Sequence, residues 1–152
     1  MQTATERLAE LGLELPAVVA PAGAYVPAVR TGDLVYTAGQ VPMVDGEMAA
    51  TGKVGAGISP DAAKGFARLC ALNALAAVDA VAGIDNVIRI VKVVGFVASA
   101  EGFTGQPGVV NGASELLGEV FGDAGKHARS AVGVAELPLG APVEVELIVE
   151  VR

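Results

Sequence analysis

The sequence contains no tryptophan, one cysteine (Cys70) and one histidine (His127). A single cysteine excludes an internal disulfide, and one cysteine with one histidine cannot supply the usual ligands of a zinc site. Cys70 falls within an apolar stretch that we expect to be helical, which indicates a buried, inert thiol rather than a nucleophile. We therefore expect a protein that works without a metal or any other cofactor.

The chain also lacks any cluster of lysine and arginine. Its net charge is −7 and its pI is about 4.6, and an acidic surface repels phosphate backbones. No stretch reaches the roughly 18 uninterrupted apolar residues of a transmembrane helix, and residues 1–15 carry charges at short intervals instead of the apolar centre of a signal peptide. We expect no specific nucleic-acid partner, no membrane and a location in the cytoplasm.

The 152 residues are 53% hydrophobic, and many of these are alanine and valine. This length and composition are typical of one domain with a core of small side chains. We expect residues 1–152 to form a single domain in which residues 1–20 are an N-terminal extension. Leucine spacing predicts a short helix over residues 5–13 of that extension.

Hydrophobic periodicity predicts two long helices and five strands. Ser59, Pro60 and Asp61 are typical of a helix start and Gly83 of a helix end, so the first long helix should run from about 59 to 82. A single apolar stripe predicts the second over 109–121. The strands are expected at 25–30, 34–41, 89–98, 127–134 and 143–151, and the last of these alternates apolar residues with carboxylates.

This order predicts an α+β protein with a mostly antiparallel or mixed sheet and two helices on one face. The strand at 89–98 is apolar on both faces, and no segment remains to cover the second face of the sheet. A second copy of the chain should cover it, which predicts a closed homo-oligomer.

Three stretches resemble the RidA (YjgF) family. Residues 127–146 read HARSAVGVAELPLGAPVEVE, similar to the family's signature of an arginine, an apolar strand, a Leu-Pro turn and a final Val/Ile-Glu strand. Residues 23–42 (GAYVPAVRTGDLVYTAGQVP) resemble its N-terminal hairpin, and residues 107–123 (PGVVNGASELLGEVFGD) resemble the segment in which an asparagine opens the second long helix. The resemblance implies a chorismate-mutase-like mixed sheet assembled as a homotrimer with clefts between subunits.

The resemblance also implies roles for individual residues. In family members that deaminate enamines and imines, the signature arginine, here Arg129, holds the substrate carboxylate, and the glutamate of the last strand, here Glu144, orients or activates water. Tyr25, the backbone of Gly39 and Asn111 border the same cleft. The implied reaction is hydrolysis of reactive 2-imino acids, such as 2-aminoacrylate or 2-iminopropionate, to 2-keto acids and ammonia.

Two positions depart from the pattern of these deaminases. Ala131 stands where many members have a substrate-binding cysteine, which contributes mainly its backbone carbonyl, and Ala38 stands where they have a serine. His127 is two residues before Arg129 and should share its strand face, although its residue type alone favours a surface histidine.

Residue types alone leave the roles open. A guanidinium fork suits a carboxylate, yet a strand arginine more often pairs with a glutamate on a wet surface, and alternation cannot distinguish Glu144 from Glu146 or Glu150. Three functions therefore remain: an imine deaminase, which Arg129 and Glu144 favour; a non-catalytic trimer that binds a small carboxylate or carbonyl compound, which the two alanines leave open; and the endoribonuclease or translation inhibitor attached to the family, which the acidic charge and the single histidine oppose.

Overall fold

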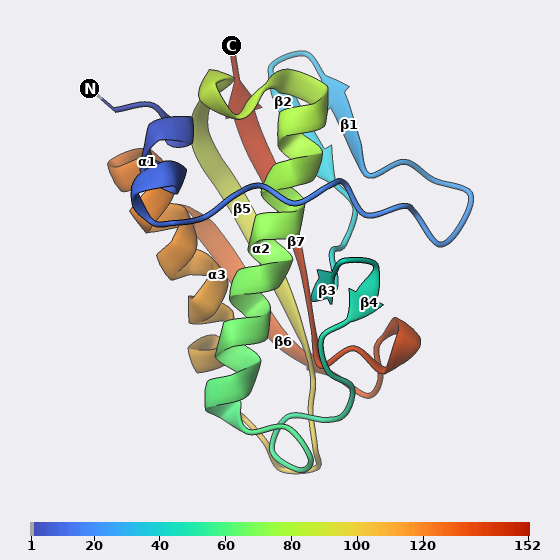
Figure 1. Cartoon of the computed structure of the whole chain (residues 1–152). Helices are drawn as coiled ribbons and strands as arrows, with labels where there is room; N and C mark the ends of the chain where they lie inside the picture. Colours follow the sequence, from blue (N-terminus) through green and yellow to red (C-terminus); the bar gives the residue numbers. More distant parts are fainter. Residues whose placement is uncertain (1) are drawn as a thin grey trace.

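The computed structural model describes residues 2–152 and contains one five-stranded sheet covered on one face by helices (Figure 1). The strands lie in the order β1-β2-β7-β5-β6, and all pairs are antiparallel except β5 with β6. In chain order the elements are α1 (Ala4–Glu10), β1 (Ala28–Thr31), β2 (Leu34–Thr37), β3 (Met43–Val44), β4 (Glu47–Met48), α2 (Pro60–Ala82), η1 (Ile84–Asn86), β5 (Val87–Ala98), α3 (Gln106–Phe121), η2 (Gly122–Gly125), β6 (Ala128–Val134), η3 (Pro138–Gly140) and β7 (Val143–Val151). The mixed sheet with two long helices on one face confirms the predicted α+β fold.

Local signals explain the bounds of α2. The Ser59 side chain accepts a hydrogen bond from the Ala62 N–H at 3.1 Å, Pro60 occupies the first helical position, and Gly83 ends the helix with a φ of 81°. By length and composition alone α2 could cross a membrane, but half of its apolar window is buried inside the molecule. The residues of α2 that face the core account for part of this apolar character.

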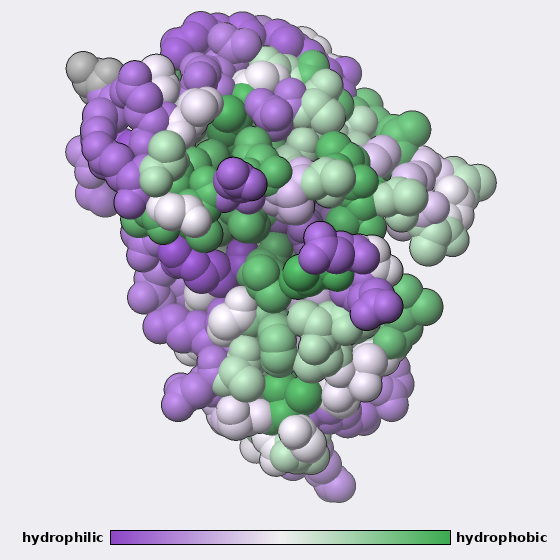
Figure 2. All heavy atoms as spheres, in the orientation of Figure 1, coloured by the Kyte–Doolittle hydropathy of each residue, from purple (hydrophilic) through white to green (hydrophobic). Residues whose placement is uncertain are grey.

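The two long helices approach each other so closely that only glycine fits at one point of contact. A Cβ at Gly112 of α3 would overlap the backbone carbonyl oxygen of Lys64 in α2. Around this point Lys64 pairs with Glu115 at 2.8 Å, and Arg68 pairs with Glu119 at 2.9 Å. In the view onto the helices, hydrophobic side chains run down the middle of the surface and hydrophilic ones gather around them (Figure 2).

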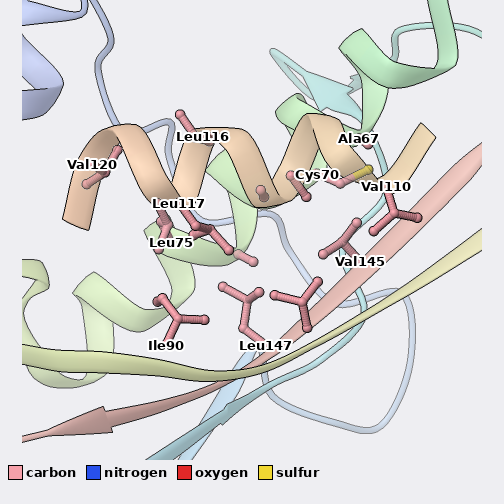
Figure 3. Close-up of a cluster of buried hydrophobic side chains, with 14 of the residues drawn as sticks. Ala67, Cys70, Leu75, Ile90, Val110, Leu116, Leu117, Val120, Val145 and Leu147 are labelled. Atoms are coloured by element: carbon pink, nitrogen blue, oxygen red, sulfur yellow. The ribbon is translucent and has the colours of Figure 1, made fainter. Parts of the chain in front are cut away.

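The core lies between the helices and one face of the sheet (Figure 3). The odd-numbered residues of β7, from Val143 to Val151, are buried, and the intervening ones are only partly buried. Leu75 and Leu117 from the helices lie over this face, and Leu116 belongs to the same buried cluster. Truncating such a buried leucine to alanine typically costs about 2–5 kcal/mol.

The other face of the sheet has no cover from residues 2–152. By strand register, Val29, Tyr36 and Val132 lie on that face, and they are 52%, 42% and 44% exposed. Several apolar side chains in water on one sheet face are typical of a surface that meets another molecule.

The N-terminal segment packs against the helical layer. A capping box joins Thr3 and Glu6 at the start of α1, and the Asp85 carboxylate accepts hydrogen bonds from the backbone N–H and the hydroxyl of Thr5 at 2.9–3.0 Å. The chain then crosses over α2 and reaches β1 on the other side (Figure 1). Residues 19–22 of this segment line a pocket that also contains Glu144 of β7.

Several predicted bounds were wrong. The first strand begins at Ala28 rather than at 25, so Tyr25 lies in a loop, and the second ends at Thr37 rather than at 41. The second long helix begins at Gln106 instead of 109, which places Asn111 in its second turn and not at its start. The short helix spans Ala4–Glu10 instead of 5–13, because Leu11 is already its C-cap.

Candidate functional site

Glu144 lies in a pocket beside β7. It faces away from the helices, because its neighbours Val143 and Val145 fill the buried positions of the strand. Burial raises the pKa of the Glu144 carboxyl above its ordinary value, and the negative charge of Glu146 raises it further. Near neutral pH such a carboxyl can take up and release a proton more readily than an exposed glutamate.

Gly39 gives the Glu144 carboxylate the space it occupies. A Cβ at Gly39 would lie 2.5 Å from Oε1 of Glu144 and 2.8 Å from its Cδ. The backbone here is fixed, since Gln40 N–H donates to the Val145 carbonyl at 2.8 Å and Val145 N–H donates to the Gln40 carbonyl at 2.9 Å. The structure thus brings Gly39 and Glu144 together within one chain.

The remaining walls of the pocket come from three segments. The pocket has a volume of about 350 Å³. Tyr25 forms part of the wall, and its hydroxyl oxygen accepts a hydrogen bond from the Ala22 N–H at 3.3 Å. The other lining residues are Val19, Ala20, Pro21, Ala22, Pro27, Gln40, Val41, Met43, Pro138 and Leu139.

The buried side chain of Asn73 supports one of these walls, and the sequence interpretation missed it. Its amide nitrogen donates to the backbone carbonyls of Val41 and Met43, both at 3.1 Å. These bonds hold the chain after β2 against α2. An asparagine inside an Ala-rich helix was the available signal, because a buried amide requires hydrogen-bond partners.

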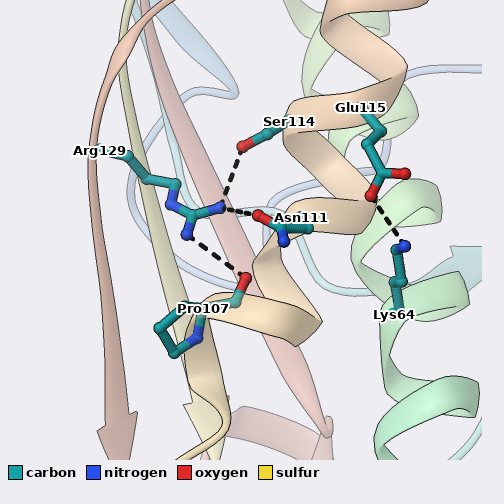
Figure 4. Close-up of polar contacts among 6 residues, drawn as sticks. All are labelled: Lys64, Pro107, Asn111, Ser114, Glu115 and Arg129. Atoms are coloured by element: carbon teal, nitrogen blue, oxygen red, sulfur yellow. Dashed lines mark hydrogen bonds and ion pairs between the residues drawn. The ribbon is translucent and has the colours of Figure 1, made fainter.

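Arg129 lies elsewhere, between β6 and α3 (Figure 4). Its Nη1 donates to Oδ1 of Asn111 at 2.7 Å and to Oγ of Ser114 at 3.2 Å, and its Nη2 donates to the Pro107 carbonyl at 3.3 Å. The structure therefore joins Asn111 to Arg129. It adds Ser114 and Pro107, which share a helix face with Asn111 at spacings of three and four.

No carboxylate among residues 2–152 pairs with Arg129. The alternative interpretation, a strand arginine paired with a glutamate, is thus wrong for the isolated chain. Three neutral oxygens hold the guanidinium in place without cancelling its charge. An arginine fixed in this way suits an anionic ligand with a planar head, such as a carboxylate.

The two groups of residues lie on opposite faces of the sheet. Arg129 is in register with Val93, a buried residue on the helix face, whereas Glu144 is in register with Phe96, which points the other way. Strand β5 separates them, so their strands are about 10 Å apart. Within one chain, Arg129 and Glu144 cannot contact the same small molecule.

The other residues singled out from the sequence lie outside both groups or at their margin. Ala131 shares the face of Arg129 and packs partly against the core. His127 precedes β6, and its Nδ1 contacts the carbonyl of Ala128 at 3.0 Å. Cys70 is buried; burial, followed by the charge of Glu144, raises the pKa of its thiol well above the ordinary value. This confirms the expected buried thiol.

The described part of the chain, residues 2–152, shows no group of three or more histidine, cysteine or carboxylate side chains placed to hold a metal ion. The polar groups available for chemistry are therefore the guanidinium of Arg129, the amide of Asn111, the carboxyl of Glu144, the hydroxyl of Tyr25 and backbone groups near Gly39. These groups can bind a carboxylate and transfer a proton.

The fold defines a chorismate-mutase-like α+β protein with one candidate group of site residues around Arg129 and another around Glu144. Residues 5–151 match the family described as "YjgF/chorismate mutase-like, putative endoribonuclease". The chain belongs to this family, which confirms the resemblance to RidA (YjgF) proteins. The match includes most of the segment that the sequence analysis set apart as an extension.

Relatives resemble the chain over nearly its whole length. Protein TCP17 of Trypanosoma cruzi is 45% identical over 147 residues, which cover 95% of this chain and 92% of that protein. The crystal structure of Atu1372 from Agrobacterium tumefaciens, described as of unknown function, is 44% identical, covers 98% of this chain and 92% of its own, and has a TM-score of 0.91. TdcF of E. coli with bound serine is 28% identical, with coverage of 90% and 93% and a TM-score of 0.64.

Proposed function

We propose that this protein is a homotrimeric imine deaminase that hydrolyses 2-imino acids to 2-keto acids and ammonia in clefts between subunits. The observation that carries the proposal is the state of Arg129: a guanidinium positioned by three neutral acceptors, with no carboxylate partner among residues 2–152. A 2-imino acid offers both a carboxylate for this group and an electrophilic C=N carbon beside it.

The separation of Arg129 and Glu144 supports a site made by two chains. The sheet face that carries Val29, Tyr36 and Val132 has no cover from the described residues of the chain. A neighbouring copy packed there buries these side chains and brings its Arg129 to the Glu144 pocket. Closed assemblies of identical chains repeat such a contact at every interface; three copies give three identical clefts.

Glu144 is assigned to the proton transfers. Its carboxylate takes a proton from water as the water oxygen bonds to the imine carbon, and the C=N electron pair moves to nitrogen, which takes that proton back from the Glu144 carboxyl to give a carbinolamine. Glu144 then removes the proton of the carbinolamine hydroxyl and delivers it to the amino nitrogen as the C–N bond breaks, so that ammonia leaves, the 2-keto acid forms and the carboxylate is restored. The raised pKa of Glu144 suits it to both accept and return the proton.

The relatives support a small carboxylate-bearing ligand. TdcF was crystallised with serine, an amino acid whose carboxylate and amino-bearing carbon have the same connectivity as those of a 2-imino acid. The family description names an endoribonuclease, but the net charge of −7 gives this chain little attraction for RNA.

The test measures ammonia or keto-acid release from imines generated in place by an amino-acid oxidase, with and without the protein. The proposal requires release faster than spontaneous hydrolysis, lost in Arg129→Ala. A parallel incubation with single-stranded RNA tests the alternative. RNA cleavage that depends on Glu144, without imine hydrolysis, replaces the proposal by the endoribonuclease; tight keto-acid binding without turnover replaces it by the binding protein.

A further inference from the structure

The pocket around Glu144 is larger and more apolar than the smallest 2-imino acids require. Its volume of about 350 Å³ falls within the ~300–1,000 Å³ usual for small-molecule sites. Apart from Gln40, Tyr25 and Glu144, its lining side chains are apolar: alanines, prolines, valines, Met43 and Leu139. The methyl group of 2-iminopropionate leaves most of such a wall in contact with water.

Leu139 is the most informative part of this wall. Its φ is 60°, in the left-handed region that residues with a side chain rarely adopt, and its side chain is 67% exposed. Asp45 is the other non-glycine residue with positive φ among residues 2–152, but it precedes Gly46 in the β3–β4 turn, where aspartate is favoured. Leu139 has no such local reason, which points to a role for its exposed side chain in the pocket.

The charge of the pocket excludes another class of side chain. Among residues 2–152, Glu144 is the only carboxylate that lines the pocket, and no lysine or arginine does. An acidic substrate side chain here meets the charge of Glu144 without a cation to neutralise it. The neighbouring chain's Arg129, proposed to lie at the mouth of this pocket, is already paired with the substrate's own carboxylate.

We infer that the Glu144 pocket selects 2-imino acids with branched aliphatic or aromatic side chains, such as those derived from leucine and phenylalanine, and that Leu139 is a specificity-determining residue. The inference rests on the proposed deaminase function and adds the substrate class to it. In an apolar pocket, each methylene group that a substrate side chain gains or lacks changes kcat/KM by at least about 10-fold.

The experiment compares kcat/KM for imines made by an oxidase from alanine, leucine, phenylalanine and glutamate. The expected order places the leucine and phenylalanine imines at least about 10-fold above the alanine imine, and the glutamate imine lowest. Leu139→Gly removes the apolar contact and the backbone strain together, so it should lower the leucine-to-alanine ratio about 10-fold. Asp45→Gly is the matched control: it also relieves a positive φ, lies outside the pocket and should leave the ratio as in the wild type.

The outcomes separate this inference from the function beneath it. Hydrolysis of all the imines with the alanine imine preferred, or an unchanged ratio in Leu139→Gly, overturns the inference and leaves the deaminase intact. Absence of hydrolysis with any imine overturns both. A reduced ratio in both glycine variants assigns the effect to backbone strain and also overturns the role of Leu139.

Discussion

Gly39 and Glu144 are so close that the carboxylate oxygen of Glu144 lies 2.5 Å from where a Cβ of residue 39 would be. Gly39 follows the end of β2, and Glu144 lies in β7. The two backbone hydrogen bonds between their neighbours Gln40 and Val145 prevent Gly39 and Glu144 from moving apart. The conformation of Gly39 is not one reserved for glycine, since its φ is outside the positive region. Space for the carboxylate, rather than backbone freedom, explains glycine at this position.

Gly39→Ala should therefore displace the Glu144 carboxylate while the fold persists. A shift of about 1 Å in a catalytic group can cost about 100-fold in rate, and we expect a loss of kcat for imine hydrolysis of that order. Gly57→Ala is the control, because a Cβ there meets no atom within 4 Å and its φ is not positive. Wild-type kcat in Gly39→Ala would show that the position of Glu144 does not matter for turnover.

Glu144→Gln should lower kcat by about 10²- to 10⁴-fold, because an amide keeps the shape of the side chain but cannot take a proton from water. Binding of a 2-keto acid, measured by calorimetry, should survive, because Arg129 is unchanged. Glu146→Gln provides the comparison on the same strand face. Equal, small effects of the two substitutions would favour the binding protein over the enzyme.

The same substitution should stabilise the fold at neutral pH. The pKa of Glu144 is raised in the folded state, so the folded protein binds this proton more tightly than the unfolded chain does. At a pH above the folded pKa, the ionised Glu144 carboxylate consequently lowers the free energy of unfolding. This loss of stability disappears when the pH falls below the ordinary pKa of glutamate. Thermal melting of the monomeric Val132→Lys protein, in which no neighbouring Arg129 offsets the charge, should show a higher Tm with Glu144→Gln than without it at pH 7–8, and equal values at about pH 4. A lower Tm at pH 7–8 would contradict the raised pKa.

Arg129→Lys should bind the substrate poorly although it keeps the charge, because an ammonium lacks the planar fork. A hydrogen bond to a charged group contributes about 1.5–3 kcal/mol, so kcat/KM should fall roughly 10- to 150-fold, and further in Arg129→Ala. Arg68→Ala is the control: it removes another arginine, which pairs with Glu119 between α2 and α3, and kcat/KM should stay as in the wild type. Unchanged kcat/KM in Arg129→Ala would mean that Arg129 does not hold the carboxylate.

Light scattering should give the mass of a trimer at micromolar concentration. Val132→Lys places a charge on the uncovered sheet face and should produce monomers without imine hydrolysis. Val81→Lys, at an equally exposed valine near the end of α2, should keep both the trimer and the activity. A wild-type protein that is monomeric and active would refute the two-chain site.

The parts of the fold that the sequence predicted are those with strong local signals. The ends of α2 follow from Ser59 and Gly83, and the bounds of β7 from strict alternation. The second helix was predicted too short because no side chain caps it at Gly105. The strand after Leu34 was predicted too long because the chain leaves the ladder after Thr37 and returns only for the bridge at Gln40.

The sequence named candidate site residues but not their arrangement. Arg129, Glu144 and Gly39 were named from motifs, yet the opposite facing of Arg129 and Glu144 depends on the register of two strands with β5. Register across three strands is a tertiary property that no local pattern reports. Asn73 was overlooked for a similar reason, since its partners are about thirty residues away in sequence.

Changes in the segment that crosses α2 can alter the shape of the Glu144 pocket without lowering the stability of the fold. Residues 20–22 border the Glu144 pocket but are exposed and belong to no helix or strand. Substitutions at such positions usually change the free energy of unfolding by no more than about 0.5 kcal/mol. Related chains can thus diverge in the ligands that fit this pocket by substitutions in residues 20–22, while the sheet and helices keep the residues that the core requires.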